Sequence, residues 1–417
     1  MMKKTLLPVF LAVFLVLAAK SASAQNYRNF QDDWTRIKAA PLSFGPFRIF
    51  PGFQLKNFGF DNNLYFENQP LRDFTATLSP EATVYLPWRN NAILYFRDNP
   101  EYHYYVKEKR QRAFTNSYFA GAKLRFFQRI VLWGDYSHGE YNQPVSVELA
   151  RPTRDVQEAV ALGLFFETAR KTALGVSWRN IRYSYQDIQL AGEVIGLSHV
   201  LNRREQSIVM EFYYQAWPGA FLFTNAGYSE YRFDQAALER DSRAAQLSVG
   251  IRFPILGKIQ GTFSLGYREL IPRNRDKQGF AGLYGDSEVS YRSGKFGLRI
   301  GFSRGDSFSY LETAYLFLGS RLSGGISYYV NRFLRLDYGA ELGLADYPGR
   351  TSVPGADGNI TEIQRRDSQV WQSVGFVLRL YKSIGLGVSY NSSRWTSNLP
   401  GWDRRKDSVG LNVTTQF

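Results

Sequence analysis

The chain has 417 residues, a formal net charge of +14 and no cysteine, which excludes a disulfide framework and thiolate metal ligands. Aromatic residues make up 16% of the chain, yet its mean hydropathy is −0.32. Beyond the N-terminus, no stretch contains the roughly 18 consecutive apolar residues of a transmembrane helix. An aromatic-rich but hydrophilic chain is typical of a transmembrane β-barrel, which presents an apolar band to lipid and keeps a polar interior.

The N-terminus has the pattern of a Sec-type secretory signal. Lys3 and Lys4 precede an apolar run from Leu6 to Ala19, and small residues follow at 22–24. This run is too short to span a bilayer, and the order of charged, apolar and small segments is that of a cleaved signal. We expect residues 1–24 to be removed by cleavage near Ala24, which leaves a net charge of +11. Residues 25–42 then form a short periplasmic lead, and residues 43–417 form the barrel.

After the lead, long segments alternate between apolar and polar residues. Residues 245–253 are one example, in which Ala, Leu, Val, Ile and Phe alternate with Gln, Ser, Gly and Arg. A two-residue period is that of a β-strand whose two faces have different surroundings. An Arg that faces lipid near the middle of the bilayer costs roughly 2–4 kcal/mol, so we expect the charged face to line the lumen.

Two classes of connection separate these segments. The short class carries the Gly, Asn, Pro or cation that tight turns favour, at 88–90, 127–129, 169–171, 217–219, 256–258, 293–295, 331–333 and 381–383. The long class is rich in charge, Gly, Asn and Pro, at 61–70, 98–112, 142–154, 187–203, 234–240, 272–279, 305–309, 347–366 and 398–405. Short turns in the periplasm that alternate with long outer loops are the outer-membrane arrangement.

The connections predict an all-β, antiparallel up-and-down transmembrane barrel with both termini in the periplasm. Eight short turns join sixteen strands in pairs, and one strand at each end makes about eighteen, with sixteen as the alternative. The even number fits single-chain bacterial barrels. The count requires residues 309–330 to form one long strand, in which Gly319, Gly324 and Gly325 allow a bend or bulge.

The candidate functional residues are cations whose phase in the strands points them inward. They are Lys123, Arg125, Arg179, Arg252, Arg268, Arg292, Arg299, Arg335 and Arg379. In a pore they would favour an anionic solute, because charged walls beside a low dielectric concentrate counter-ions. They could instead brace the wall by pairing with inward acids, among them Glu211, Glu288, Asp337 and Glu341. The inward aromatics Phe165 and Tyr213 could stack on sugar rings or serve as packing.

Signals for an enzyme are weak. Histidine occurs only at 103, 138 and 199, without metal-ligand spacing, and no phosphate-binding or dinucleotide loop is present. The one candidate for a Ser nucleophile with a His base is Ser137 beside His138, but neighbours in a strand point to opposite faces. The sequence therefore predicts no enzyme, cofactor or metal. Export also makes nucleic acid an improbable partner for this basic chain.

The last residues again read as a barrel strand. Counting back in twos from Phe417 gives a mostly apolar face, with polar residues between. A final strand that ends in an aromatic residue resembles the signal by which bacterial barrels are recognised for assembly, so we expect the outer-membrane assembly machinery as a partner through Phe417. We accordingly expect an integral protein of a Gram-negative outer membrane, in contact with its lipid.

Motifs near the start of the barrel resemble a known family. Gly45 to Pro51, Gly59 to Tyr65 and Asp73 to Pro80, followed by Asn142 to Pro144 and Leu201 to Glu205, resemble the putative β-barrel porin 2 family. That family occurs with exopolysaccharide biosynthesis and export systems, and the resemblance carries over no catalytic residue. Physically, Asp61-Asn62-Asn63 suits a turn, and Pro80 predicts an irregular strand because it cannot donate to the ladder.

The resemblance implies a barrel that passes a secreted polysaccharide across the outer membrane. Together with the basic lumen, it predicts a conduit for an exopolysaccharide, expected to be anionic, delivered by a periplasmic export partner. The alternative is a general diffusion porin that prefers anions. A barrel enzyme acting on lipid or polysaccharide is the third interpretation. A barrel plugged by its own loops, with residues 347–366 as the segment to fold inward, is the fourth.

Overall fold

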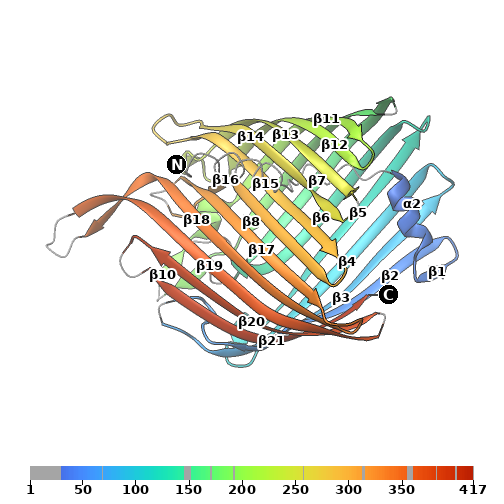
Figure 1. The fold of residues 1–417 in the computed structure, drawn as a ribbon. Helices are drawn as coiled ribbons and strands as arrows, with labels where there is room; N and C mark the ends of the chain where they lie inside the picture. Colours follow the sequence, from blue (N-terminus) through green and yellow to red (C-terminus); the bar gives the residue numbers. More distant parts are fainter. Residues whose placement is uncertain are drawn as a thin grey trace, which may run out of the picture.

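The computed structural model describes residues 30–67, 69–144, 152–169, 171–190, 193–256, 258–311, 315–354, 360–381, 383–399 and 402–416. Eighteen antiparallel strands form a closed barrel (Figure 1). They are β2 (Phe47–Asp61), β3 (Asp73–Trp88), β4 (Ala92–Tyr105), β5 (Ala113–Phe126), β6 (Ile130–Pro144), β7 (Pro152–Ala169), β8 (Thr172–Tyr185), β11 (Arg203–Trp217), β12 (Ala220–Phe233), β13 (Ser242–Leu256), β14 (Ile259–Pro272), β15 (Phe280–Ser293), β16 (Phe296–Phe308), β17 (Leu316–Tyr329), β18 (Leu334–Pro354), β19 (Ile360–Tyr381), β20 (Ile384–Ser397) and β21 (Arg404–Gln416).

Each barrel strand pairs with its neighbours in sequence, and β2 pairs with β21 to close the sheet. The prediction of eighteen strands is confirmed, and the alternative of sixteen is wrong. Three short strands lie outside this set: β1 (Leu42–Phe44) pairs with β2, while β9 (Ile188–Leu190) and β10 (Glu193–Ile195) form a hairpin before helix α3 (Leu197–Leu201). Two 3₁₀ turns, η2 (Lys109–Gln111) and η3 (Ala236–Leu238), lie in the connections β4–β5 and β12–β13.

The seam between β2 and β21 contains a bulge. Asn57 has a φ of 53°, and the register of both β2 ladders shifts beside it. Its backbone N–H donates to Oδ1 of Asn412 on β21 over 2.9 Å, and its carbonyl accepts from the hydroxyl of Thr75 on β3. Asn is one of the few residues with a side chain that tolerates this left-handed backbone. Neighbouring side chains therefore fix the position of the bulge.

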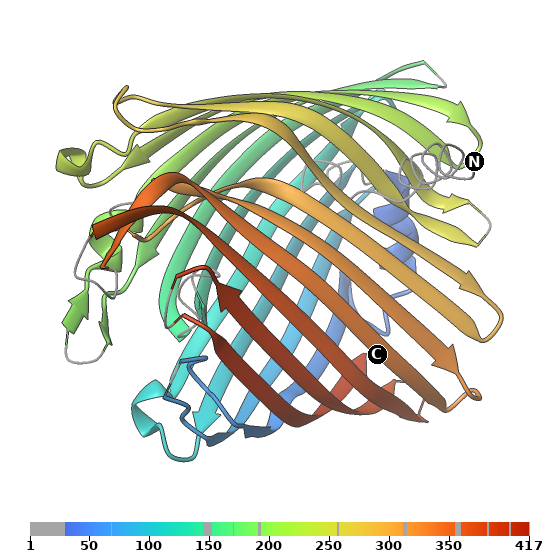
Figure 2. The ribbon, with the colours of Figure 1, turned by 60° about the vertical axis from the view of Figure 1, so that its left-hand side comes forward.

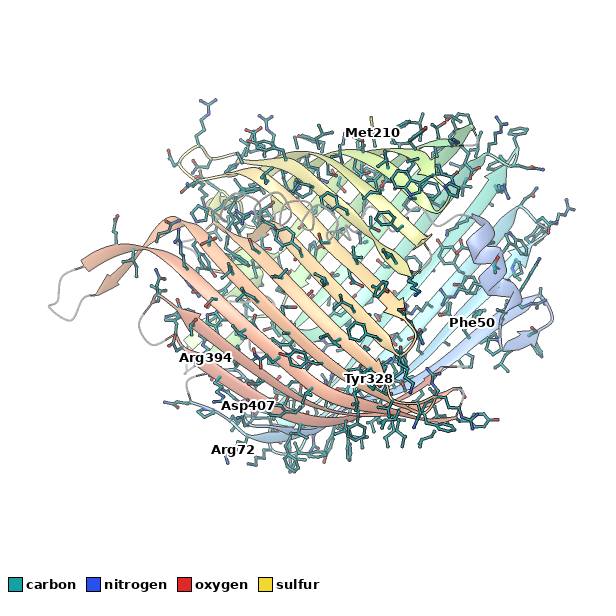
Figure 3. The ribbon with its side chains drawn as sticks, viewed as in Figure 1. Phe50, Arg72, Met210, Tyr328, Arg394 and Asp407 are labelled. Carbon is teal, nitrogen blue, oxygen red and sulfur yellow. The ribbon has the colours of Figure 1, made fainter. Side chains whose placement is uncertain are left out.

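The pleat separates an apolar outer face from a polar inner face. Leu247 and Val249 are more than half exposed on the outside, and Ser248 between them is buried. Met210 and Tyr328 are two further exposed residues of the outer wall (Figure 3). Exposed aromatics also surround the short turns, at Trp88, Phe127, Trp217, Phe333 and Tyr381. An apolar band with an aromatic girdle is the surface that lipid requires.

The eight short turns occur where the sequence predicts them, and the described termini lie at the same end of the barrel. Gln416 pairs with Gly52 near the start of β2, and Thr415 pairs with Ile384 next to a short turn. The side of the membrane on which this end lies remains the prediction made above. Residues 1–24 and Phe417 lie outside the described residues.

Two predicted loops are wrong. Residues 347–366 are largely strand, because the β18–β19 ladder resumes at Arg350 and Gln364 after a register shift and continues to Pro354. A hairpin that projects beyond lipid can carry polar residues on both faces, so its composition looks like that of a loop. Likewise, residues 305–308 belong to β16, which ends at Phe308, and β17 begins only at Leu316, so the single strand predicted over 309–330 is wrong at its start.

The predicted periplasmic lead contains helix α2 (Phe30–Lys38). It lies at the short-turn end of the barrel (Figure 1 and Figure 2). Trp34 and Ile37, three residues apart on one helix face, pack on the inward residues Tyr85 and Ile93 of β3 and β4. No helix in the described part of the chain is long and apolar enough to cross a membrane.

Candidate functional site

The inner wall carries charges of both signs in close pairs. Each pair joins an Arg to an acid at hydrogen-bond or ion-pair distance: Arg203–Glu205 at 2.8 Å, Arg268–Asp306 at 2.6 Å, Arg299–Glu288 at 3.6 Å, Arg321–Glu341 at 3.0 Å and Arg335–Asp337 at 2.9 Å. Neighbouring charges of the same sign would repel each other, whereas the two opposite charges of each pair attract. The wall therefore offers donors and acceptors side by side.

The structure places the nine predicted cations on inward-facing strand positions, but with different surroundings. Arg268, Arg299 and Arg335 belong to the pairs just given, and Lys123 Nζ lies 2.5 Å from Asp33 of α2. Arg125 donates to the Gln128 carbonyl of the following turn, and the Arg292 guanidinium lies 4.5 Å from the centroid of the Tyr329 ring. The remaining three stand on β8, β13 and β19: Arg179, Arg252 and Arg379. The bracing interpretation therefore applies to part of the set, and a pore-lining role stays a prediction.

The tip of the β16–β17 hairpin leaves the wall and folds into the lumen. Pairing between β15 and β16 ends at Gly285 and Arg304, although both strands continue, while β16 still pairs with β17 up to Phe308 and Leu316. Phe308 packs on the inward rings of β12, with centroids 5.2 Å from Tyr231 and 5.0 Å from Phe233. The inward segment is thus this hairpin tip and not residues 347–366.

Arg240, from the β12–β13 connection, holds the hairpin in place. It is only 3% exposed. Its guanidinium donates to the carbonyls of Ser309 at 2.7 Å, Tyr315 at 2.8 Å and Val200 at 3.3 Å. The first two carbonyls belong to the turn of the hairpin, and the third belongs to α3. One buried cation therefore ties three connections together.

The hairpin tip also packs on α3 and on β18. Phe308 and Tyr310 contact a buried cluster of Leu197, Val200 and Leu201, and Phe317 packs with Ala345 and Tyr347. The β18–β19 extension is braced there, because buried Arg365 pairs with Asp367 at 2.7 Å and lies between the rings of Tyr347 and Trp402. The long-loop end of the lumen is narrowed by these contacts.

A cavity of about 830 Å³ lies beside the hairpin. Its lining combines aromatic rings with charged groups, namely Tyr185, Tyr231, Phe308, Trp395, Arg203, Glu205, Arg268, Asp306, Arg321, Asp367 and Lys406. Trp395 is 4% exposed, and its indole nitrogen has no hydrogen-bond acceptor among the described residues. The cavity is therefore more polar than the usual small-molecule site, which is a concave apolar surface with a few placed polar groups.

The short-turn end of the lumen is occupied by α2. Besides the Asp33–Lys123 pair, the Arg36 guanidinium lies 5.5 Å from the ring centroid of Phe50 and 5.9 Å from that of Tyr85. Beneath the helix, the Tyr95 hydroxyl donates to Asp135. Sequence reasoning did not identify this helix in the lumen, although the apolar pair Trp34 and Ile37 at helical spacing was an available signal.

Comparison with known proteins agrees with this architecture. Residues 37–417 match the family described as Putative beta-barrel porin 2. The chain belongs to this family. Among solved structures, Acinetobacter baumannii OccAB2 is similar, with a TM-score of 0.50, 12% identity, and 88% of this chain and 98% of that chain covered. Pseudomonas aeruginosa OpdK, at a TM-score of 0.49 and 11% identity, covers the same shares. No curated protein sequence matches. At these identities the structural likeness concerns the fold alone.

The porin is thus an outer-membrane β-barrel, and the motifs behind the family resemblance build its first long loop. Asn63 donates to the carbonyls of Glu67 and Arg405 and accepts from the Glu67 N–H. Asp73 accepts from the N–H groups of Lys107 and Glu108, both at 2.9 Å, and joins this loop to the next. The expected irregularity at Pro80 is present, since β3–β4 pairing lapses between Leu78 and Ala82.

The porin's one candidate nucleophile and base do not meet. His138 stacks on the ring of Tyr118 at 5.0 Å and lies 3.5 Å from Glu158. Ser137 is the adjacent strand residue and points to the other face. Within the described ranges, no group of three potential ligands could hold a metal ion.

Proposed function

We propose that this porin conducts a secreted polysaccharide through the outer membrane without chemical change. The observation that supports the proposal is the cavity beside the inward hairpin, where aromatic rings and ion pairs line one passage. Aromatic faces pack on the C–H faces of sugar rings, and charged groups make strong hydrogen bonds to hydroxyls. Trp395 supplies one of the aromatic side chains of this lining.

The charge pattern bears on which polymer would pass. The charges that line the cavity are mostly paired, so this part of the lumen offers hydrogen-bond donors and acceptors without a strong preference for anions or for cations. Elsewhere, no acid of the described residues lies within ion-pair distance of Arg179, Arg292 or Arg379, so these three cations remain to attract an anionic solute. We therefore propose that the polymer is acidic and that a periplasmic partner delivers it to the short-turn end.

The same three cations favour the alternative function, a diffusion porin that prefers small anions. Single-channel conductance in planar bilayers distinguishes the two. A conduit has anion preference together with block by micromolar acidic polysaccharide added on the short-turn side. A diffusion porin passes small anions and is indifferent to the polymer.

The contribution of the cavity is tested with Trp395→Ala, with Trp178→Ala on the outer wall as the matched control. The first substitution removes an aromatic ring from the lining of the cavity, so we expect polymer block to weaken about tenfold, as the loss of one aromatic contact implies. The control should leave the block unchanged. Equal block in both variants and the native protein would contradict the assignment of the cavity.

A further inference from the structure

Rows of arginine lie on the outer wall near the long-loop end. Arg204 of β11 is in register with Arg182 of β8 on one side and with Arg232 of β12 on the other. All three side chains are exposed. Directly opposed residues of neighbouring strands have Cβ atoms about 5 Å apart, so three guanidinium groups share one short line of the surface.

The same arrangement recurs elsewhere on the barrel. Arg394 of β20 is in register with Arg405 of β21, and both side chains are exposed. Figure 3 shows Arg394 and Asp407 at the long-loop end of these strands. Two separate surfaces therefore carry arginine opposite arginine.

Such rows are unfavourable unless an anion compensates them, because like charges directly opposite each other destabilise a sheet. Nearby acids pair with only three of these five arginines: Arg232 pairs with Glu230 at 3.0 Å, Arg182 lies 4.0 Å from Asp234, and Arg405 pairs with Asp407 at 3.0 Å. Arg204 and Arg394 have no acid at ion-pair distance in the described part of the chain. Each row thus retains one arginine, Arg204 or Arg394, that can bind an anion from outside the protein.

The height of the rows on the wall points to the source of that anion. Arg182, Arg232 and Arg394 each follow an exposed outer aromatic by four residues: Trp178, Tyr228 and Tyr390. Four residues of strand span about 13 Å, and a tilt near 40° leaves about 10 Å along the membrane normal. The hydrocarbon edge lies at the aromatic girdle, and the headgroup region beyond it is roughly 5–8 Å deep. The Arg backbone positions therefore lie just beyond the headgroup region, and the long Arg side chains can reach back to the lipid headgroups.

We propose that the two arginine rows bind the phosphate groups of phosphorylated lipids in the leaflet on the long-loop side. Arg matches phosphate because its planar fork donates two parallel hydrogen bonds to two oxygens. A lipid, in contrast to a free anion, keeps its acyl chains on the adjacent apolar band while its phosphate meets the row. This site is on the outer wall and is independent of what passes through the lumen.

The test is native mass spectrometry of the full-length barrel in detergent with bis-phosphorylated lipid A as the probe. We expect Arg182→Gln/Arg204→Gln/Arg232→Gln and Arg394→Gln/Arg405→Gln each to lower lipid occupancy, with apparent affinity reduced about tenfold. The control Arg89→Gln/Arg129→Gln/Arg332→Gln makes the same charge change as the triple variant at exposed short turns of the opposite rim and should bind as the native protein does. Folding of each variant is checked by its heat-dependent shift on gels.

Three results would overturn the proposal. One is equal lipid binding by the row variants and the native barrel. Another is equal binding of lipid A from which the phosphates have been removed, which would assign binding to the acyl chains. The third is displacement of the lipid by an equal concentration of inorganic phosphate, which would make the rows a site for free anions.

Discussion

Replacing Arg240 by Met should release the inward hairpin. The guanidinium makes three hydrogen bonds to carbonyls from a site that is 3% exposed. A hydrogen bond to a charged group contributes about 1.5–3 kcal/mol, and an unpaired buried carbonyl costs about 1–3 kcal/mol. If the substitution destabilises the closed arrangement by a net value of about 3 kcal/mol, the ratio of closed to open forms falls roughly a hundredfold.

The assay is single-channel recording of Arg240→Met beside Arg243→Met. Arg243 is exposed on the outer face of β13, opposite Glu230, so its loss changes charge without touching the hairpin. We expect long-lived openings of higher conductance in the first variant only. If Arg240→Met folds and its conductance and noise equal those of the native channel, Arg240 does not hold the hairpin in the lumen.

Three other predictions concern the connections and α2. Burial, followed by the charge of Arg240, lowers the pKa of Lys277 below 10.5. Between that lowered pKa and pH 10.5 the closed loops bind fewer protons than the open loops, so the closed form becomes more stable as the pH rises. Conductance should therefore fall toward pH 10.5 in the native channel and not in Lys277→Met, while Tyr315, whose pKa burial raises to about 12, stays neutral. Ile37→Ala should weaken docking of α2 by roughly 2–5 kcal/mol, which faster tryptic cleavage at Arg36 and Lys38 would report. Asp73→Asn weakens two charge-assisted bonds to backbone amides, and hydrogen exchange at Lys107 and Glu108 should accelerate about tenfold; unchanged exchange would contradict the structural role of Asp73.

The barrel wall could be predicted from the sequence because its strands and tight turns are determined by residues close together in the chain. Alternation such as that of residues 245–253 follows from lipid on one side and polar lumen on the other, and tight turns need their own residue types. The departure of β16 from β15 after Arg304 could not be predicted, since it depends on contacts of Phe308 and Asp306 with β12 and β14. The extended β18–β19 hairpin lies above the lipid, where the alternation that identifies a strand fades.

The bulged seam has a consequence for how the molecule forms. Asn57 and Asn412 are 355 positions apart in the chain, yet their contact fixes the register of the closing pair. Closure must await the last strand, and such non-local pairing is slow because the chain loses loop entropy before any contact is gained. Until then, β2 and β21 are unpaired edges that can join other chains. A slip of one residue at closure would turn the side chains of β21 inside out, and the Asn57–Asn412 hydrogen bond forms only in the native register.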